Sequence, residues 1–205
     1  MSFPIKENGT ATSPGRTDIL FEFYSDDDTA VDEVISFGVT DANPVIELCG
    51  INGAQNIYNR WKEFYKFSTE ENTKYDNEGV ALRIVRKGTV AYLFVDGRQV
   101  ASVDLTNKGT NNVKADTYAK VTLRHYDKKG TFQFPFAVTS NVEETTVNIV
   151  ANEHGTVSTN GIYVDGDLTT VVPSTKHFMN EIVTLTVTPT DSSYACTSLL
   201  VNGKE

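Results

Sequence analysis

The stretch from residue 80 to 105 constrains the fold of this chain more than any other part of it. Its apolar residues recur at every second position, as at Leu82 and Ile84, and this period places alternate side chains on opposite faces of a β-strand. Lys87-Gly88 and Asp96-Gly97 interrupt the pattern, and Asp-Gly between two strand patterns is a strong signal for a tight hairpin turn. We therefore expect a meander of three antiparallel strands.

Similar short runs recur along the chain, separated by turn residues. Together with the meander they occupy residues 19–24, 34–40, 45–51, 80–86, 89–95, 99–105, 119–126 and 132–139. Val and Thr make up nearly a quarter of the chain, and β-branched side chains favour strands over helices. Eight short strands of this kind predict an all-β fold, an antiparallel β-sandwich.

One segment, residues 56–67, has the spacing of an amphipathic helix. Its apolar residues at 57, 61, 64 and 65 would form one helical stripe. Trp61, Tyr65 and Phe67 also fit the period of a strand, in which aromatic residues are common. The sequence leaves helix and strand equally open here.

Composition divides the chain into three parts. Residues 1–17 are rich in Gly, Ser, Thr and Pro and predict a flexible leader, and ordered structure is expected from 18 to 140. Beyond a polar joint near 141, residues 142–205 are strongly acidic and alternate at 147–151 and 182–189. This last part predicts a small all-β repeat module, near the lower size limit for independent folding.

Charge and cysteine content exclude several classes of partner. A net charge of −9 and a pI near 4.8 provide no basic surface for nucleic acid or anionic lipid. No apolar run is long enough for membrane insertion. Cys49 and Cys196 are too few and too far apart for a disulfide scaffold or a zinc site, so two buried free thiols are expected, with a bridge between them as the alternative.

The meander, read as GVALRIVRKGTVAYLFVDGRQVASVDL from Gly79 to Leu105, resembles the laminin-G-like and concanavalin-A-like jelly rolls. The resemblance covers about residues 18–140, with 134–140 as a closing strand. It implies a jelly-roll form of the sandwich. It implies less about function, because this fold serves lectins, adhesion domains and glycosidases alike.

The last part resembles the divergent internalin B-repeat of bacterial surface proteins. The matching residues are His154-Gly-Thr-Val-Ser158, Asn180-Glu-Ile-Val-Thr-Leu-Thr-Val-Thr-Pro-Thr190, Tyr194 and Ser198-Leu-Leu-Val-Asn-Gly203. Ser192-Ser193 departs from the family pattern, in which Gly commonly precedes the Tyr. The resemblance implies an extracellular spacer or adhesive unit at the bacterial cell surface, with no catalytic residues.

The acidic residues do not form the motif of a glycosidase. Such an enzyme needs two carboxylates facing one groove, and adjacent acids on a strand, such as Asp32 and Glu33, point to opposite faces. Glu22 and Glu47 lie within apolar strands and are expected mainly on solvent-exposed faces, with a groove carboxylate as the alternative. We therefore expect a protein that is not an enzyme.

No cofactor is expected. His125, His154 and His177 are scattered and are interpreted as structural or surface residues. The acidic clusters at 26–28 and 76–78 offer oxygen ligands, so calcium stays open as a minor alternative to solvated loops.

The strongest candidate for ligand binding is an aromatic cluster interleaved with polar groups. Sugars stack on aromatic rings and bond to planar polar side chains, and Tyr58, Asn59, Arg60, Trp61 and Tyr65 supply both. The alternatives are that Trp61 fills the core or contacts a protein partner.

These observations favour a non-catalytic recognition or adhesion segment of a bacterial cell-surface or secreted protein. Its expected partners are a glycan, bound through the jelly roll, or the surface of a host or extracellular protein. A glycoside hydrolase or its accessory domain, and a purely structural stalk spacer, are the alternatives.

Overall fold

The computed structural model gives a mostly β protein with one short helix. It describes residues 2–3, 5–6, 16–24, 31–40, 44–50, 62–105, 119–126, 131–132, 142–151, 153–164, 167–171, 176–200 and 204. In the strands before residue 51, only the side chains of Phe21 and Ile35 are described. The expectation of a β-rich, mainly antiparallel fold is confirmed for this part of the chain.

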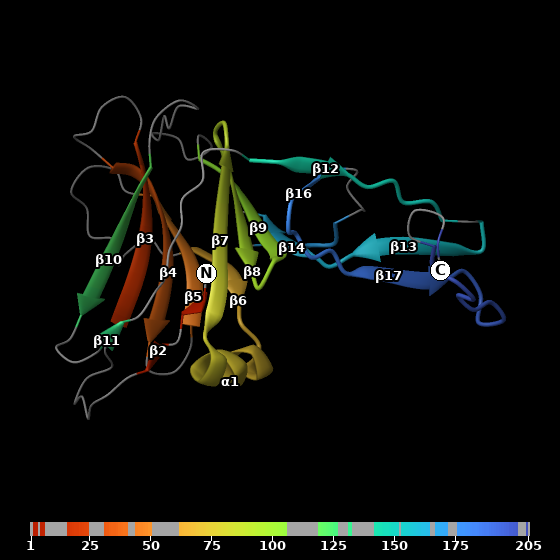
Figure 1. Cartoon of the computed structure of the whole chain (residues 1–205), viewed down its shortest axis with the longest axis horizontal. Coiled ribbons are helices and arrows are strands. Elements are labelled where there is room, and N and C mark those ends of the chain that lie inside the picture. The colour runs from red at the N-terminus through yellow and green to blue at the C-terminus, as the bar shows by residue number, and fades with distance from the viewer. Residues whose placement is uncertain are drawn as a thin grey trace.

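Two large sheets form the main body of the structure (Figure 1). The first has the strand order β1 (Ser2–Phe3), β7 (Val80–Lys87), β8 (Val90–Val95), β9 (Arg98–Asp104), β14 (Ile162–Val164) and β15 (Asp167–Thr169). The second has the order β10 (Ala119–Tyr126), β3 (Arg16–Tyr24), β4 (Val31–Thr40), β5 (Pro44–Gly50) and β6 (Lys62–Lys66).

Three short ladders complete the described strands. They pair β11 (Thr131–Phe132) with β2 (Ile5–Lys6), β12 (Glu144–Thr146) with β16 (Lys176–Phe178), and β13 (Gly155–Thr159) with β17 (Leu185–Pro189). We call residues 142–200, where described, the tail, and the ladder of β13 and β17 its arm. In Figure 1 the arm extends away from the two large sheets.

The main hydrophobic core lies between the two large sheets. Alternation along β8 directs Ala91, Leu93 and Val95 into this core, where each is at most 2% exposed. Ile35 from β4 packs into it from the second sheet, and Phe21 borders it. Each fully buried aliphatic or aromatic side chain contributes about 1.5–3 kcal/mol, so this layer stabilises the body of the protein.

The hairpin expected at Asp96-Gly97 is confirmed. Strands β8 and β9 pair antiparallel up to Val95 and Arg98, leaving a two-residue loop. Both loop residues have positive φ, 47° at Asp96 and 81° at Gly97, as a type I′ turn requires. The turn at Gly88, which joins β7 to β8, is confirmed as well.

The helix lies outside the segment where the sequence left helix and strand open. Residues 62–66 of that segment form strand β6, while residues 56–61 lie outside the described structure. Helix α1 spans Thr69–Glu78 and was not predicted, because this polar segment has no apolar stripe. Its start is capped: the Ser68 hydroxyl accepts a hydrogen bond from the Glu71 amide at 3.1 Å, and a Glu71 carboxylate oxygen accepts one from the Ser68 amide at 2.8 Å.

The tail joins the first sheet directly. Strand β14 pairs parallel with β9, matching Tyr163 with Ala101, and Tyr163 packs against the main core. The boundary expected near 141 stays a prediction, because residues 133–141 lie outside the described structure.

Two strand expectations in the tail need correction. Residues 147–151 form no strand: the described pairing of β12 runs to Thr146, opposite Lys176, and Val150 is 91% exposed. The strand expected at 182–189 begins only at Leu185. Ile182 instead donates its amide to the Gly97 carbonyl at 2.6 Å.

Within the described residues, no helix combines the length and the hydrophobicity that crossing a bilayer demands.

Gly97→Val should destabilise the protein by about 1–3 kcal/mol, because a β-branched residue tolerates positive φ poorly. A Cβ at this position would also lie 3.1 Å from the Ile182 side chain. Urea unfolding monitored by circular dichroism measures the effect. Gly97→Asn is the matched control, since Asn adopts positive φ more readily and should cost less. Equal unfolding free energies for Gly97→Val and the unchanged protein would contradict the turn assignment.

Candidate functional site

A pocket of about 400 Å³ lies where the tail covers the outer face of the first sheet. We call it the seam pocket. Because alternate residues of a strand share a face, Tyr92 and Phe94 of β8 point away from the main core, and Ser102 and Gln99 are their cross-strand neighbours on β9. Tyr92, Gln99 and Ser102 line the pocket on the sheet side. The tail lines the other side through residues of β12, β13 and β16 and the turns beside them.

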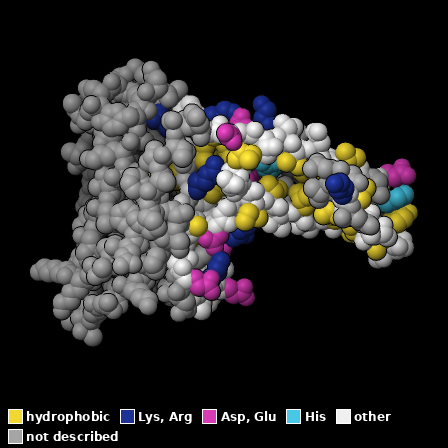
Figure 2. Space-filling view, in the orientation of Figure 1, with side chains coloured by type: hydrophobic (Ala, Val, Ile, Leu, Met, Phe, Trp, Pro, Cys, Tyr) yellow, Lys and Arg dark blue, Asp and Glu magenta, His cyan; other side chains and the backbone are white. Residues whose placement is uncertain are grey.

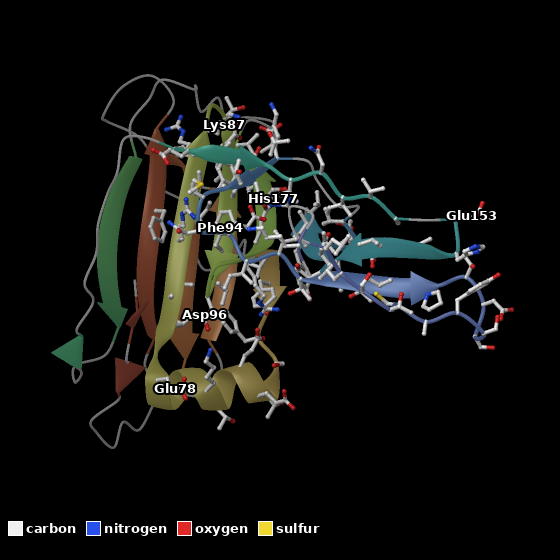
Figure 3. All side chains as sticks on the ribbon, turned by 45° about the vertical axis from the view of Figure 1, so that its right-hand side comes forward. Glu78, Lys87, Phe94, Asp96, Glu153 and His177 are labelled. Carbon is white, nitrogen blue, oxygen red and sulfur yellow. The ribbon has the colours of Figure 1, made fainter. Side chains whose placement is uncertain are left out.

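Phe178 attaches the tail to the outer face of the sheet. Its ring meets Tyr92 edge-on at 4.9 Å between centroids and Phe94 at 5.9 Å, both favourable aromatic geometries. Together with Val85 these residues form a second hydrophobic cluster, in which Phe94 is only 1% exposed. Figure 3 shows Phe94 and His177 in the region where tail and sheet meet.

Arg83 supports this contact from the edge of the cluster. Its guanidinium carbon lies 5.3 Å from the centroid of the Phe94 ring, within cation–π range, and its Nη1 donates a hydrogen bond to the Met179 carbonyl at 2.5 Å. One side chain of β7 therefore contacts both the sheet and the tail.

A buried His–Glu pair forms part of the pocket wall. His177 Nδ1 lies 3.2 Å from Glu181 Oε1, and both side chains are less than 10% exposed. The second Glu181 oxygen accepts the Phe178 amide at 3.0 Å, so the carboxylate folds back over its own turn. Asn180, with a φ of 64°, reverses the chain between the two partners. The pair is fixed in place and presents polar groups to the pocket.

An ion pair lines the pocket beside β7. Lys87 Nζ donates to Glu144 Oε1 at 2.6 Å. The hydrogen bond from Lys87 lowers the pKa of Glu144 below its ordinary value, so this carboxylate stays ionised at neutral pH. Lys176 also lines the pocket, and its charge acts on Glu144 in the same direction.

Uncharged polar groups also line the pocket. Asn160 donates its side-chain amide to the Gln99 carbonyl at 3.3 Å and accepts the Thr184 amide at 3.4 Å. Ser102 and Thr159 add hydroxyl groups to the lining. The pocket thus combines an aromatic ring and aliphatic side chains with amides, hydroxyls, one ion pair and the His177–Glu181 pair.

Tyr65 is the described member of the aromatic cluster that the sequence predicts to bind a ligand, and its ring packs against other aromatic residues of the protein. Tyr65 of β6 is half-buried and meets Phe67 edge-on at 5.0 Å and Tyr163 at 5.8 Å. Its hydroxyl donates to Glu71 Oε1 at 2.6 Å. Tyr58, Asn59, Arg60 and Trp61 lie outside the described residues. Their role in ligand binding, and that of Tyr65, stays a prediction.

Glu71 connects helix α1 to the β8–β9 hairpin. The same oxygen that accepts the Tyr65 hydroxyl also accepts Arg98 Nη2 at 2.9 Å. Lys74 of the helix pairs with Asp96 in the hairpin turn at 2.8 Å. Burial raises the pKa of Tyr65 well above its ordinary value of 10.0, and the hydrogen bond to Glu71 raises it further.

The other residues named from the sequence do not gather at one site. Glu22, Glu33 and Glu47 lie on β3, β4 and β5 and His125 on β10, but their side chains are outside the described set. His154 stacks on Tyr194 at 4.4 Å in the tail, away from His177.

The calcium and cysteine expectations have different outcomes. The acidic cluster at 26–28 is outside the described residues, and no group of His, Cys, Asp or Glu suited to a metal is found in the part of the chain that is described. Calcium stays a prediction. Cys196 carries a free thiol as expected, but the expectation that it is buried is wrong, because it lies in the exposed stretch 190–200.

Sequence reasoning did not find the seam pocket. His177 was noted only as a scattered histidine, and Glu181, Phe178 and Tyr92 were not considered together. The sequence held one local signal: Tyr92 and Phe94 alternate with the core residues of β8 and so lie on its outer face. Two large aromatic rings on an outer face indicate that something covers that face.

In comparisons with known proteins, no family model, no curated protein and no solved structure matches this chain.

Tyr65→Phe should reduce the loss of stability in alkaline solution. Because the pKa of Tyr65 is higher in the folded than in the unfolded state, the unfolded chain releases this proton first. Its contribution to stability is therefore complete below pH 10 and declines as the pH rises above it. Urea unfolding at neutral pH and above pH 10 measures the difference.

The matched control for this titration is Tyr194→Phe, which removes a hydroxyl from an exposed ring. Of the two variants, only Tyr65→Phe should make the decline of the unfolding free energy above pH 10 shallower. Identical pH profiles for Tyr65→Phe and the unchanged protein would contradict the raised pKa of Tyr65, and with it the burial and the Glu71 hydrogen bond that cause it.

Proposed function

We propose that this chain is a non-catalytic recognition or adhesion segment of a bacterial cell-surface or secreted protein. It acts outside the cell and binds carbohydrate through a laminin-G-like jelly roll, to which an internalin-B-repeat-like tail is attached. Its partners are glycans or the glycosylated surfaces of host or extracellular proteins. Two stacked, mainly antiparallel sheets with a shared core are compatible with such a jelly roll.

The seam pocket is the observation that carries this proposal. A saccharide presents apolar C–H faces and many hydroxyl groups, which suit an aromatic ring flanked by amides and hydroxyls. Tyr92, Gln99 and Asn160 supply these groups within one pocket. Amide side chains both donate and accept hydrogen bonds, as sugar hydroxyls do, so they can orient a sugar without charge.

A glycoside hydrolase is the first alternative, because Glu144 and Glu181 line the same pocket. A glycosidase needs one carboxylic acid with a raised pKa to protonate the leaving group. The pKa of Glu144 is lowered by Lys87, the opposite direction, and Glu181 is held by His177 and the Phe178 amide. These contacts favour binding over hydrolysis.

A stalk spacer is the second alternative, and the arm favours it. The arm extends away from the main sheets (Figure 1), and four of the five residues of β17 are exposed. In Figure 2 hydrophobic side chains reach the surface along the tail. Val187, Leu199 and Leu200 are among the exposed hydrophobic residues of this part of the chain. A spacer needs no ligand, so binding experiments separate the two functions.

Screening the whole chain on an array of neutral, sulfated and sialylated glycans, with extracellular-matrix proteins beside them, tests the proposal. We expect a restricted set of glycans to be retained, with Kd values between millimolar and micromolar, or about −4 to −8 kcal/mol. Retained glycans should be intact by mass spectrometry after prolonged incubation. Cleavage would establish the hydrolase, and the absence of any specific binding to glycans or proteins would favour the spacer.

A further inference from the structure

We propose that the seam pocket is the carbohydrate site of this protein, that it takes an uncharged, hydroxyl-rich ligand, and that it binds only while the tail is docked on the sheet. This inference rests on the proposed function and specifies where, and in which state, the ligand binds.

The pocket is formed by two parts of the chain. The sheet contributes the faces of β8 and β9 with Tyr92, Gln99 and Ser102. The tail contributes the opposite wall with Asn160, His177 and other residues. The sheet face alone is a surface without a second wall, and small ligands bind well only where a concave site buries most of their area. Removing the tail from this face would therefore abolish the site.

The charges of the lining favour an uncharged ligand. Two lysines, Lys87 and Lys176, are balanced by two glutamates, Glu144 and Glu181. Glu144 accepts the Lys87 hydrogen bond, and Glu181 already faces His177. An anionic sugar therefore gains no net attraction from the lining, and the net charge of −9 of the whole chain disfavours its approach. A neutral sugar meets no such repulsion.

The backbone amide of Ile182 reports whether the tail is docked on the sheet. The Ile182 amide of the tail donates to the Gly97 carbonyl of the hairpin at 2.6 Å, so it is protected from hydrogen exchange only while the two parts are together. A ligand that binds only the docked state slows opening of this bond. With ligand at 100 times its Kd, exchange limited by undocking should slow by about 100-fold.

Two variants separate the ligand contact from docking. Gln99→Ala removes a side-chain amide from the pocket but keeps the backbone carbonyl that accepts Asn160. Phe178→Ala removes the ring that packs on Tyr92 and Phe94. Thr156→Ala, at an exposed position on β13 outside the pocket, is the matched control. Trp61→Ala tests the alternative aromatic cluster.

The experiment uses the whole chain with neutral glucose-, galactose-, mannose- and N-acetylglucosamine-containing oligosaccharides, each beside a uronic-acid or sialylated counterpart. Affinity is measured by titration calorimetry, and exchange of the Ile182 amide by NMR. We expect neutral sugars to bind at least about tenfold more tightly than their anionic counterparts. Gln99→Ala should lower the affinity for neutral sugars about tenfold and leave the protection of the Ile182 amide unchanged. Phe178→Ala should lower both the affinity and the protection of this amide.

Three outcomes would overturn the inference. Unchanged affinity in Gln99→Ala, with loss in Trp61→Ala, would move the carbohydrate site away from the seam and leave the proposed function intact. Tighter binding of the anionic sugars would contradict the charge argument. If none of the oligosaccharides binds the unchanged protein, the inference and the carbohydrate function fail together. If Phe178→Ala does not fold, Gln99→Ala and the ligand-dependent exchange of Ile182 still decide the matter.

Discussion

The contact of Phe178 with the outer face of the first sheet is the interaction on which the arrangement of this protein depends. An antiparallel sheet commonly packs one face on the core and leaves the other in water. Here β8 is covered on both faces, by the main core on one side and by the tail on the other. Without this contact Tyr92 and Phe94 would be exposed, and the seam pocket would have no second wall.

Polar contacts place the tail but contribute unequally to its attachment. Exposed pairs such as Lys87–Glu144 contribute little to stability, because water and salt screen them. The His177–Glu181 pair is buried, and removing one partner of a buried polar contact costs about 1–3 kcal/mol. Hydrophobic packing thus supplies most of the attachment, while the buried pair fixes the conformation of the turn beside Phe178. The same residues shape the proposed carbohydrate site.

The meander of β7 to β9 could be predicted from the sequence, because it is determined by residues that are close together in the chain. The alternation of β7 to β9 and the Asp96-Gly97 turn are properties of neighbouring residues, and both were predicted from the sequence. Helix α1 was missed although Ser68 and Glu71 have the spacing of a capping box, because the segment lacks an apolar stripe. Hydrophobic periodicity alone is therefore a poor guide to a short polar helix.

The seam could not be predicted because its partners are far apart in the chain. Nothing near Phe178 indicates that its ring will meet Tyr92 and Phe94, and the pairing of β14 with β9 is equally non-local. His177 and Glu181 have the i, i+4 spacing of helical neighbours but meet across a tight turn. Their relation appears only when the chain has folded.

A double-mutant cycle between Phe94 and Phe178 tests the central claim most directly. Each is replaced by Leu, alone and together, and unfolding free energies are measured in urea. The proposed contact predicts a coupling of about 0.5–1.5 kcal/mol. Phe67 lies in the other hydrophobic cluster, so a Phe94–Phe67 cycle should be additive within about 0.5 kcal/mol. Additivity in the Phe94–Phe178 cycle as well would show that the Phe178 ring does not pack on Phe94 at this face of the sheet.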